Sequence, residues 1–139
     1  MTSPAHWLLK TEPSTYSLAD LRRDERTNWD GIRNYQARNF LKLIKKDDLA
    51  LIYHSGDERS VVGIARVIKE AYPDPDSRKK GDWVQVDLEF MKAFNSPVPL
   101  AEIKTRTALQ SLLLLKQSRL SVSPVTAAHY QAILKMGAN

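Results

Sequence analysis

The sequence has no cysteine and no long run of apolar residues. The absence of cysteine excludes disulfide bonds, thiolate nucleophiles and cysteine-ligated zinc, and it is typical of proteins in a reducing compartment. Apolar runs such as residues 49–53 and 112–115 are far too short to cross a bilayer. The first residues do not resemble a signal peptide, because Lys10 and Glu12 follow a short apolar stretch. We therefore expect a cytoplasmic protein that does not enter a membrane.

The motifs of common enzyme classes are absent as well. There is no GxGxxG, GxxxxGK[ST], GxSxG or HExxH, so the phosphate-loop, nucleophile-elbow and zinc-protease patterns all fail. The segment "DPDSRKKGDWVQ" begins like a calcium loop, but Lys79 and Gln85 stand where that loop needs glycine and a bidentate glutamate. We predict no metal and no cofactor, and we interpret Asp74 as a turn residue.

What the sequence does have is the composition of a globular domain with a basic balance. Its 139 residues are 42% hydrophobic and 27% charged, which predicts one domain, residues 1–139, with a real core. Lysine and arginine number 21 against 16 acidic residues, and the pI is about 9.5. A positive balance favours polyanionic partners such as nucleic acid, but many small proteins are mildly basic, so the charge alone shifts the odds only slightly. We expect a monomer.

Apolar alternation predicts the strands, which are expected at residues 6–10, 49–54, 60–72, 83–94 and 120–125. The fourth alternates best. Its inward residues are predicted to be Val84, Val86, Leu88 and Phe90, and its outward residues Gln85, Asp87 and Glu89. Pro124 is expected to stop the last strand.

Capping residues and helical spacing predict the helices. Ser17 caps a helix over residues 18–23, Thr126 caps the last helix, and short helical turns are expected after Pro99 and over residues 109–115. Strands outnumber long helices and do not alternate regularly with them. The pattern therefore predicts an α+β fold, a mixed barrel with helices on its outside.

The helix expected from Asn34 to Lys45 buries Ala37, Phe40, Leu41 and Ile44. Its other face carries a basic stripe of Arg38, Lys42 and Lys45, next to an N-terminus that favours anions. Arg33, Arg38 and Lys42 are either solvated charges or a phosphate-binding set. Tyr35 is expected to be partly buried.

The segment "WDGIRNYQARNFL" has two interpretations. Trp29-Asp30-Gly31 is predicted to form a turn that leaves Trp29 near its tip, as a core plug or as a stacking platform for a planar ligand. From this segment alone the plug is slightly favoured. Asn34 either caps the helix or reads a base edge.

Among the three histidines, His129 is expected on the surface and His6 is uninformative. His54 ends a strand in "YHS". Catalysis by His54 with Ser55 is a weak hypothesis, because adjacent strand residues point to opposite faces.

Several segments together resemble the EVE domain family: "WLLKTEPSTYSLADL", "WDGIRNYQARNFL", "YHS", "VVGIARVIKEAYPDP" and "SRLSVSPVT". The resemblance covers Trp7 to about Leu134. It implies a PUA-like mixed β-barrel, akin to the YTH domain, with a pocket for a modified nucleobase flipped out of DNA or RNA, methylated or hydroxymethylated for example. It implies no catalysis and no metal.

The resemblance also implies a binding site. Trp29 would stack on the base, and the other residues would line or complete the pocket: Asp30, Gly31, Asn34, Tyr53, His54, Ser55, Lys10, Glu12, Ser14, Arg119, Leu120 and Ser121. The segment "DSRKKGD" is shorter than the insertion that many relatives carry, although "RKK" could substitute electrostatically. Two alternatives remain, a hydrolase or nucleotide-processing enzyme using His54 and Glu12, and a structural protein with a vestigial pocket.

Overall fold

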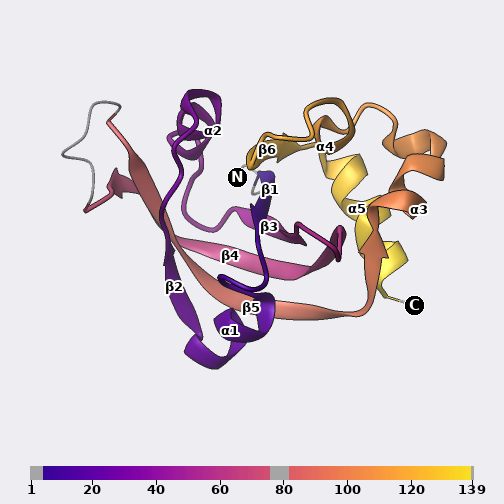
Figure 1. Ribbon diagram of the computed structural model, residues 1–139, viewed down its shortest axis with the longest axis horizontal. Helices are drawn as coiled ribbons and strands as arrows, with labels where there is room; N and C mark the ends of the chain where they lie inside the picture. Colours follow the sequence, from indigo (N-terminus) through magenta and orange to yellow (C-terminus); the bar gives the residue numbers. More distant parts are fainter. Residues whose placement is uncertain (1–4, 76–81, 139) are drawn as a thin grey trace.

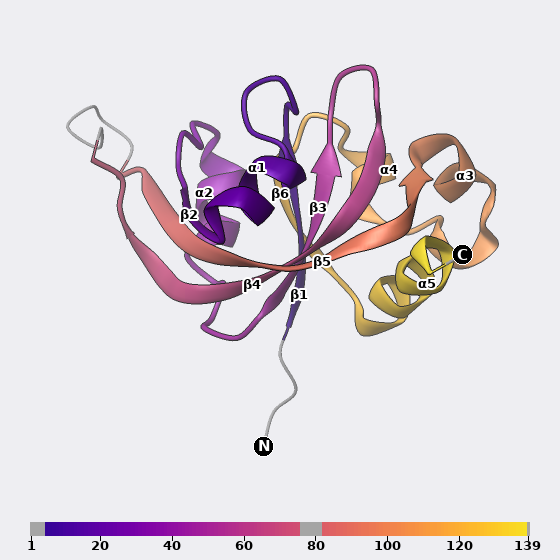
Figure 2. The ribbon, with the colours of Figure 1, turned by 90° about the horizontal axis from the view of Figure 1, so that it is seen from below.

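Six strands form one curved mixed sheet in the order β2-β5-β4-β3-β1-β6 (Figures 1 and 2). The computed structural model describes residues 5–75 and 82–138. β1 pairs with β3 in parallel, and the other pairs are antiparallel. The strands are β1 (His6–Thr11), β2 (Arg26–Trp29), β3 (Leu49–His54), β4 (Ser60–Pro73), β5 (Val84–Pro99) and β6 (Val122–Val125). This confirms the α+β class, and the sheet is open rather than closed, because no ladder in the described residues joins β2 to β6.

The helices lie outside the sheet in two groups, with α1 and α2 toward the end that carries β2 and the remainder toward the other end (Figure 2). They are α1 (Leu18–Asp24), α2 (Tyr35–Leu41), α3 (Leu100–Thr105), the 3-10 helix η1 (Thr107–Leu109), α4 (Leu113–Lys116) and α5 (Ala127–Gly137). In the part of the chain that the structure describes, no helix has the length and apolarity needed to span a membrane.

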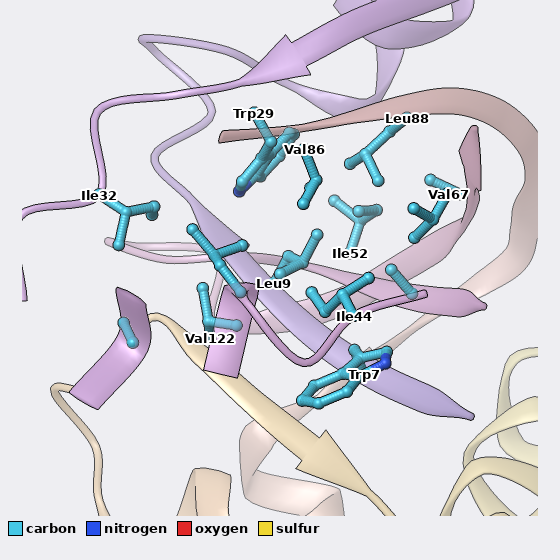
Figure 3. Close-up of a cluster of buried hydrophobic side chains, with 14 of the residues drawn as sticks. Trp7, Leu9, Trp29, Ile32, Ile44, Ile52, Val67, Val86, Leu88 and Val122 are labelled. Carbon is cyan, nitrogen blue, oxygen red and sulfur yellow. The ribbon is translucent and has the colours of Figure 1, made fainter. Parts of the chain in front are cut away.

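Alternation along the central strands divides the interior into two cores. Trp7 and Leu9 of β1 face the first core with Trp29 of β2, while Leu8 faces the second core with residues of α3 to α5. Figure 3 shows side chains of the first core, among them Trp7, Leu9 and Trp29, gathered together. Trp29 is therefore part of the packed interior as well as the last residue of its strand.

The predicted helix caps are confirmed. The Asp20 N–H donates to Ser17 Oγ at 3.1 Å and the Ser17 N–H donates to the Asp20 carboxylate at 2.9 Å, a capping box that begins α1. Asn34 Oδ1 accepts from the Ala37 N–H at 2.9 Å, and Thr126 caps α5 in the same way. These bonds are local, which is why the sequence reveals them.

α2 ends at Leu41, four residues before the predicted Lys45. The following segment is fixed by the buried Asp48, whose Oδ2 accepts from the Lys45 N–H at 2.8 Å and from Trp7 Nε1 at 2.9 Å. The predicted stripe of Arg38, Lys42 and Lys45 is therefore not on one continuous helix. With seven residues, α2 also offers little macrodipole.

β2 was not expected from the sequence, because only Trp29 of its four residues is buried and no alternation is visible. Trp29 thus lies in an edge strand, opposite Val86, rather than at the tip of a turn. The prediction that Gln85 faces outward is wrong. Gln85 is buried, and its Oε1 accepts from Asn28 Nδ2 at 3.1 Å, because β2 covers that end of β5.

Two smaller expectations also need correction. His129 is buried rather than on the surface, with its Nε2 3.2 Å from Ser111 Oγ, because η1 and the turn after it pack against α5. β6 continues past Pro124 to Val125, which is possible because β6 is an edge strand and needs no N–H on its open side. β5 likewise continues past Phe94 to Pro99.

Candidate functional site

A cavity of about 510 Å³ lies between the end of β1 and the end of β2. We call it the β1–β2 pocket. One wall is the segment that leaves β1, and the other is the end of β2 with the loop after it. The lining residues are Lys10, Thr11, Glu12, Thr15, Tyr16, Thr27, Asn28, Trp29, Asp30, Gly31 and Ile32. The structure thus brings together five residues that the family resemblance implied, from segments far apart in the sequence.

Lys10 supplies the cation of the β1–β2 pocket. Its Nζ donates to the Ser118 carbonyl at 2.5 Å and lies 5.6 Å from the centre of the Tyr53 ring. Partial burial removes water from the ammonium group and lowers the pKa of Lys10. A partly desolvated ammonium that keeps a carbonyl partner is a well-positioned hydrogen-bond donor for a ligand.

Glu12 supplies a carboxylate on the same wall. Its carbonyl accepts from the Thr15 and Tyr16 N–H groups at 2.9 Å each, so a tight turn fixes the segment. Its side chain packs on Gly56, where an added Cβ would lie 2.6 Å from Glu12 Oε2 and where φ is +76°. Ser14 Oγ lies 3.3 Å from Oε1. Gly56 therefore leaves the room that this carboxylate occupies.

Trp29 forms the aromatic wall. Only 7% of the residue is exposed, and its ring meets the Tyr16 ring edge to face, with the centroids 6.3 Å apart and the planes at 82°. The ring is thus held by the core while it also borders the pocket. Trp29 therefore fills part of the core and lines the pocket at the same time.

The loop after β2 is held by Asp74, a buried carboxylate that the sequence analysis interpreted as a turn residue. Asp74 Oδ2 accepts from the Gly31 N–H at 3.1 Å and from Arg33 Nη1 at 3.2 Å. Gly31 has a φ of +76°, which suits glycine in the turn after Asp30. Asp74 belongs to the motif "AYPDP", but its partners Gly31 and Arg33 lie 43 and 41 positions away, so the sequence did not reveal the contact.

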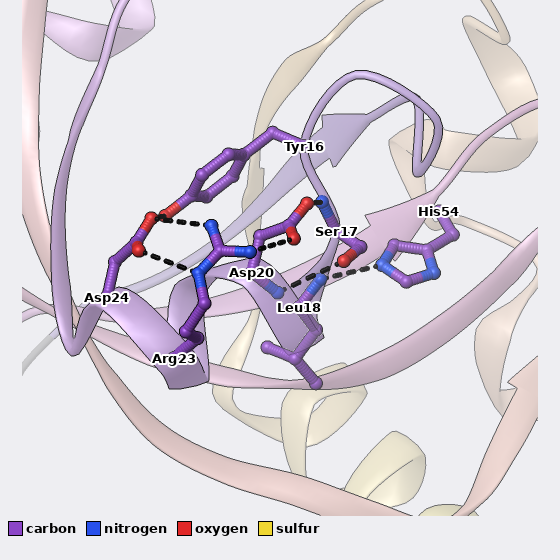
Figure 4. A network of polar contacts seen from close by, with 7 residues as sticks. All are labelled: Tyr16, Ser17, Leu18, Asp20, Arg23, Asp24 and His54. Atoms are coloured by element: carbon purple, nitrogen blue, oxygen red, sulfur yellow. Dashed lines mark hydrogen bonds and ion pairs between the residues drawn. The ribbon is translucent and has the colours of Figure 1, made fainter.

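His54 lies outside the set of residues that line the β1–β2 pocket. Its Nε2 accepts from the Leu18 N–H at 3.0 Å (Figure 4). Nδ1 therefore carries the proton, and it contacts the Glu58 carboxylate. Tyr53 is buried in the second core. Ser55 Oγ donates to the Thr11 carbonyl at 3.3 Å. The "YHS" segment thus holds the start of α1 and the end of β1 in place without lining the β1–β2 pocket itself.

A second hollow of about 360 Å³ is polar and contains three more of the implied residues, Asn34, Arg119 and Leu120. We call it the α2–α4 groove; it is lined by Asn34, Gln36, Lys116, Gln117, Ser118, Arg119 and Leu120. The bond from Lys10 Nζ to the Ser118 carbonyl joins it to the β1–β2 pocket. Ser121 contributes its carbonyl, which accepts from the Lys10 N–H at 3.0 Å. Five of the implied site residues therefore line the β1–β2 pocket and three line the α2–α4 groove, whereas the other five line neither: Ser14, Tyr53, His54, Ser55 and Ser121.

The phosphate candidates differ in how they are held. Arg33 pairs with Asp74, whereas Arg38 donates to Asn39 Oδ1 at 2.8 and 3.1 Å and lies over the Tyr35 ring. Lys42 is exposed at the end of α2. The "RKK" segment, residues 78–80, lies outside the described residues. Within the described ranges, no group of three or more potential ligand side chains could hold a metal ion.

Comparison with known proteins matches both the sequence and the fold. A family model of the EVE domain matches residues 5–136. Thymocyte nuclear protein 1 of Gallus gallus is 35% identical over 94% of this chain and 68% of its own length. A hypothetical protein from Leishmania major has a TM-score of 0.91 and 38% identity, over 97% of this chain and 95% of that one. Human THYN1 protein, solved in complex with DNA containing 5-methylcytosine, has a TM-score of 0.89 and 33% identity, over 97% of this chain and 98% of that one.

Proposed function

Because the chain belongs to the EVE domain family, we propose that it is a non-catalytic module that binds DNA and accepts a modified base in the β1–β2 pocket. The observation that carries this proposal is the pocket itself, with an aromatic wall on one side and fixed polar groups on the other. Its volume of about 510 Å³ falls in the range of small-molecule sites. The human relative crystallised with 5-methylcytosine DNA supports the choice of ligand.

The polar groups of the pocket can pair with the Watson–Crick edge of a cytosine. A carboxylate accepts hydrogen bonds only, and the N4 amino group of cytosine is a donor. An ammonium group donates only, and O2 and N3 of cytosine are acceptors. Lys10, Glu12 and Asp30 line the same cavity as Trp29. We infer a base that lies against Trp29 and presents its Watson–Crick edge to these groups.

A base can reach such a pocket only when it leaves the stack, and the strand on either side then needs a phosphate track. The α2–α4 groove offers Lys116 and Arg119 beside the pocket, and Lys42 is exposed at the C-terminal end of α2. These cations hold the backbone in our proposal, whereas Arg33 is engaged with Asp74 and supports the loop.

The enzyme alternative has less support. The hypothesis pairs His54 with Glu12, but both His54 ring nitrogens already have partners, Leu18 and Glu58. Glu58 lies on the exposed loop between β3 and β4, away from the residues that line the pocket. We therefore propose recognition without chemistry. A cytoplasmic compartment and a monomeric state remain predictions.

The test is a binding panel. Matched oligonucleotides with cytosine, 5-methylcytosine or 5-hydroxymethylcytosine, as DNA and as RNA, are titrated at two salt concentrations. We expect DNA with a modified cytosine to bind more tightly than its unmodified match, with both affinities falling as salt rises. Equal affinity for all three bases in every context would overturn the modified-base proposal. Tighter binding to RNA than to DNA would mean that RNA is the nucleic acid that the protein recognises.

A further inference from the structure

Tyr35 is the one exposed aromatic side chain among the large hydrophobic residues that the structure describes, with 57% of its surface open. From the sequence, a partly buried side chain was expected at this position. Its ring instead lies on the outside of α2, against Trp83, with the two centroids 5.0 Å apart and the planes at 31°. An exposed phenol ring supported from beneath is not needed to close either core.

Two arginines extend this contact at both ends. The Arg33 guanidinium lies 5.5 Å from the centre of the Trp83 ring, and the Arg38 guanidinium lies 5.0 Å from the centre of the Tyr35 ring. Trp83 is 7% exposed, so Tyr35 rests on a fixed surface. We call these four residues, Arg33, Trp83, Tyr35 and Arg38, the Tyr35 platform.

The platform is rigidly connected to the pocket. The buried Asp74 carboxylate binds Arg33 of the platform and the N–H of Gly31, which lines the β1–β2 pocket. The Asn34 cap fixes the turn of α2 that carries Tyr35. The ring therefore has a defined position relative to any base in the pocket, and it loses little freedom when a ligand stacks on it.

We propose that the Tyr35 ring is a second stacking site, which takes an unpaired base of the same strand as the base held in the pocket. This inference rests on the function proposed above. Aromatic rings stack on every base because every base has a π-face. The Arg38 guanidinium lies over the Tyr35 ring, so in this proposal it moves aside when a base stacks there and meets the phosphate of that nucleotide, which an apolar peptide side chain does not offer. Arg33 lies on Trp83 and pairs with Asp74, so it supports the platform from beneath. The protein should then prefer single-stranded or locally opened DNA, irrespective of the identity of the neighbouring base.

The experiment uses single-stranded DNA with one 5-methylcytosine and a 2-aminopurine as the neighbouring base, on either side. Stacking on Tyr35 quenches 2-aminopurine, so the emission should fall on binding to the wild-type protein and not on binding to Tyr35→Ala. We expect Tyr35→Ala to weaken binding about tenfold, for methylated and unmodified strands alike, and Tyr35→Phe to stay within about twofold. Leu43→Ala is the control, since Leu43 is an exposed residue, at 60%, without a ring.

An abasic nucleotide in place of the neighbouring base should remove the difference between wild type and Tyr35→Ala. The side chain is exposed, so both Tyr35 variants should melt within a few degrees of the wild type. A preference for methylated DNA together with wild-type affinity in Tyr35→Ala overturns this inference alone. A tenfold effect of Tyr35→Ala without any methyl preference overturns the pocket proposal alone, and the absence of all DNA binding overturns both.

Discussion

His54 Nε2 accepts a hydrogen bond from the backbone N–H of Leu18 at 3.0 Å, so the end of β3 holds the first turn of α1. The N–H of an opening helical residue has no partner inside its own helix, and the buried imidazole provides one. Figure 4 shows this bond next to the capping box of Ser17 and Asp20. His54, the histidine that looked most like a catalytic base, therefore has a structural role, because it fixes the start of α1.

Replacing His54 should lower the stability of the fold. His54→Phe keeps the volume of the ring but leaves the buried Leu18 N–H without an acceptor, which should reduce the free energy of unfolding by about 1–3 kcal/mol. Urea denaturation followed by circular dichroism measures the difference. Glu58→Gln is the control, because its side chain is 53% exposed and a pair of this kind contributes at most about 1 kcal/mol. Wild-type stability in His54→Phe contradicts the role assigned to this bond.

Acid should weaken the fold through His6. Its ring stacks on Tyr130 with the centroids 4.1 Å apart, and burial lowers the pKa of His6 below its usual 6.5, while Asp48 partly opposes this. The unfolded chain therefore binds a proton more readily than the folded one, and stability falls as the pH drops below about 6.5 toward the lowered value. Unfolding curves between pH 7 and 5 should show this loss, and His6→Gln should reduce it. An NMR titration that gives His6 a raised pKa would reverse the sign.

Local patterns in the sequence predicted much of the fold. The short apolar run of β1, the alternation in β3 and β5 and the caps of α1 and α5 depend on residues a few positions apart, so they can be read without the structure. β2 has no such pattern, and its existence depends on pairing with the distant β5. The early end of α2 depends on Asp48, which contacts Trp7 from 41 positions away. Long-range hydrogen bonds were the information that the sequence lacked.

The candidate site shows the same division. The family resemblance singled out Lys10, Glu12 and Trp29, and the structure places them around one cavity. Their roles stay predictions until binding is measured. Asp74 and Tyr35 were missed, because the first contacts the loop after β2 across more than forty positions and the second is exposed only because Trp83 fills the space beneath it. No local signal distinguishes such residues from an ordinary turn or helix residue.

Salt should separate backbone contacts from base contacts. Lys42→Ala should weaken binding to methylated and to unmodified DNA by the same factor, because a phosphate contact carries no base information. It should also reduce the slope of the logarithm of the binding constant against the logarithm of the salt concentration by about 1. Fluorescence anisotropy at several salt concentrations measures both quantities. The matched control is Lys104→Ala, an exposed lysine of α3 at the other end of the sheet. A selective loss for methylated DNA would place Lys42 at the base instead.

Glu12→Gln should reduce discrimination at the Watson–Crick edge. 5-Methylcytosine and thymine share the methyl group but differ in presenting a donor or an acceptor at position 4. The carboxylate accepts only, whereas the amide can serve both bases, so the ratio of the two affinities should fall by about tenfold or more, the equivalent of about 1–3 kcal/mol. Competition binding with the two oligonucleotides measures the ratio. Glu58→Gln removes the same charge outside the pocket and should leave the ratio unchanged; an unchanged ratio in Glu12→Gln removes this residue from base reading.

Variants of Trp29 should distinguish its contribution to the stability of the fold from its contribution to base stacking. Because the residue is only 7% exposed and packs in the first core, Trp29→Ala should lower the free energy of unfolding by about 3–5 kcal/mol. Trp29→Phe keeps a ring in the core, so it should stay folded, but it covers less of a base and should weaken binding to methylated DNA, since stacking contributes about 1–3 kcal/mol. Trp7→Phe is the matched control, because Trp7 is equally buried in the same core but does not line the β1–β2 pocket. Calorimetric unfolding and DNA titration should show that both phenylalanine variants lose stability and that only Trp29→Phe loses affinity. Equal losses of affinity would mean that the effect arises from the core, and wild-type affinity in Trp29→Phe would exclude Trp29 as a stacking surface.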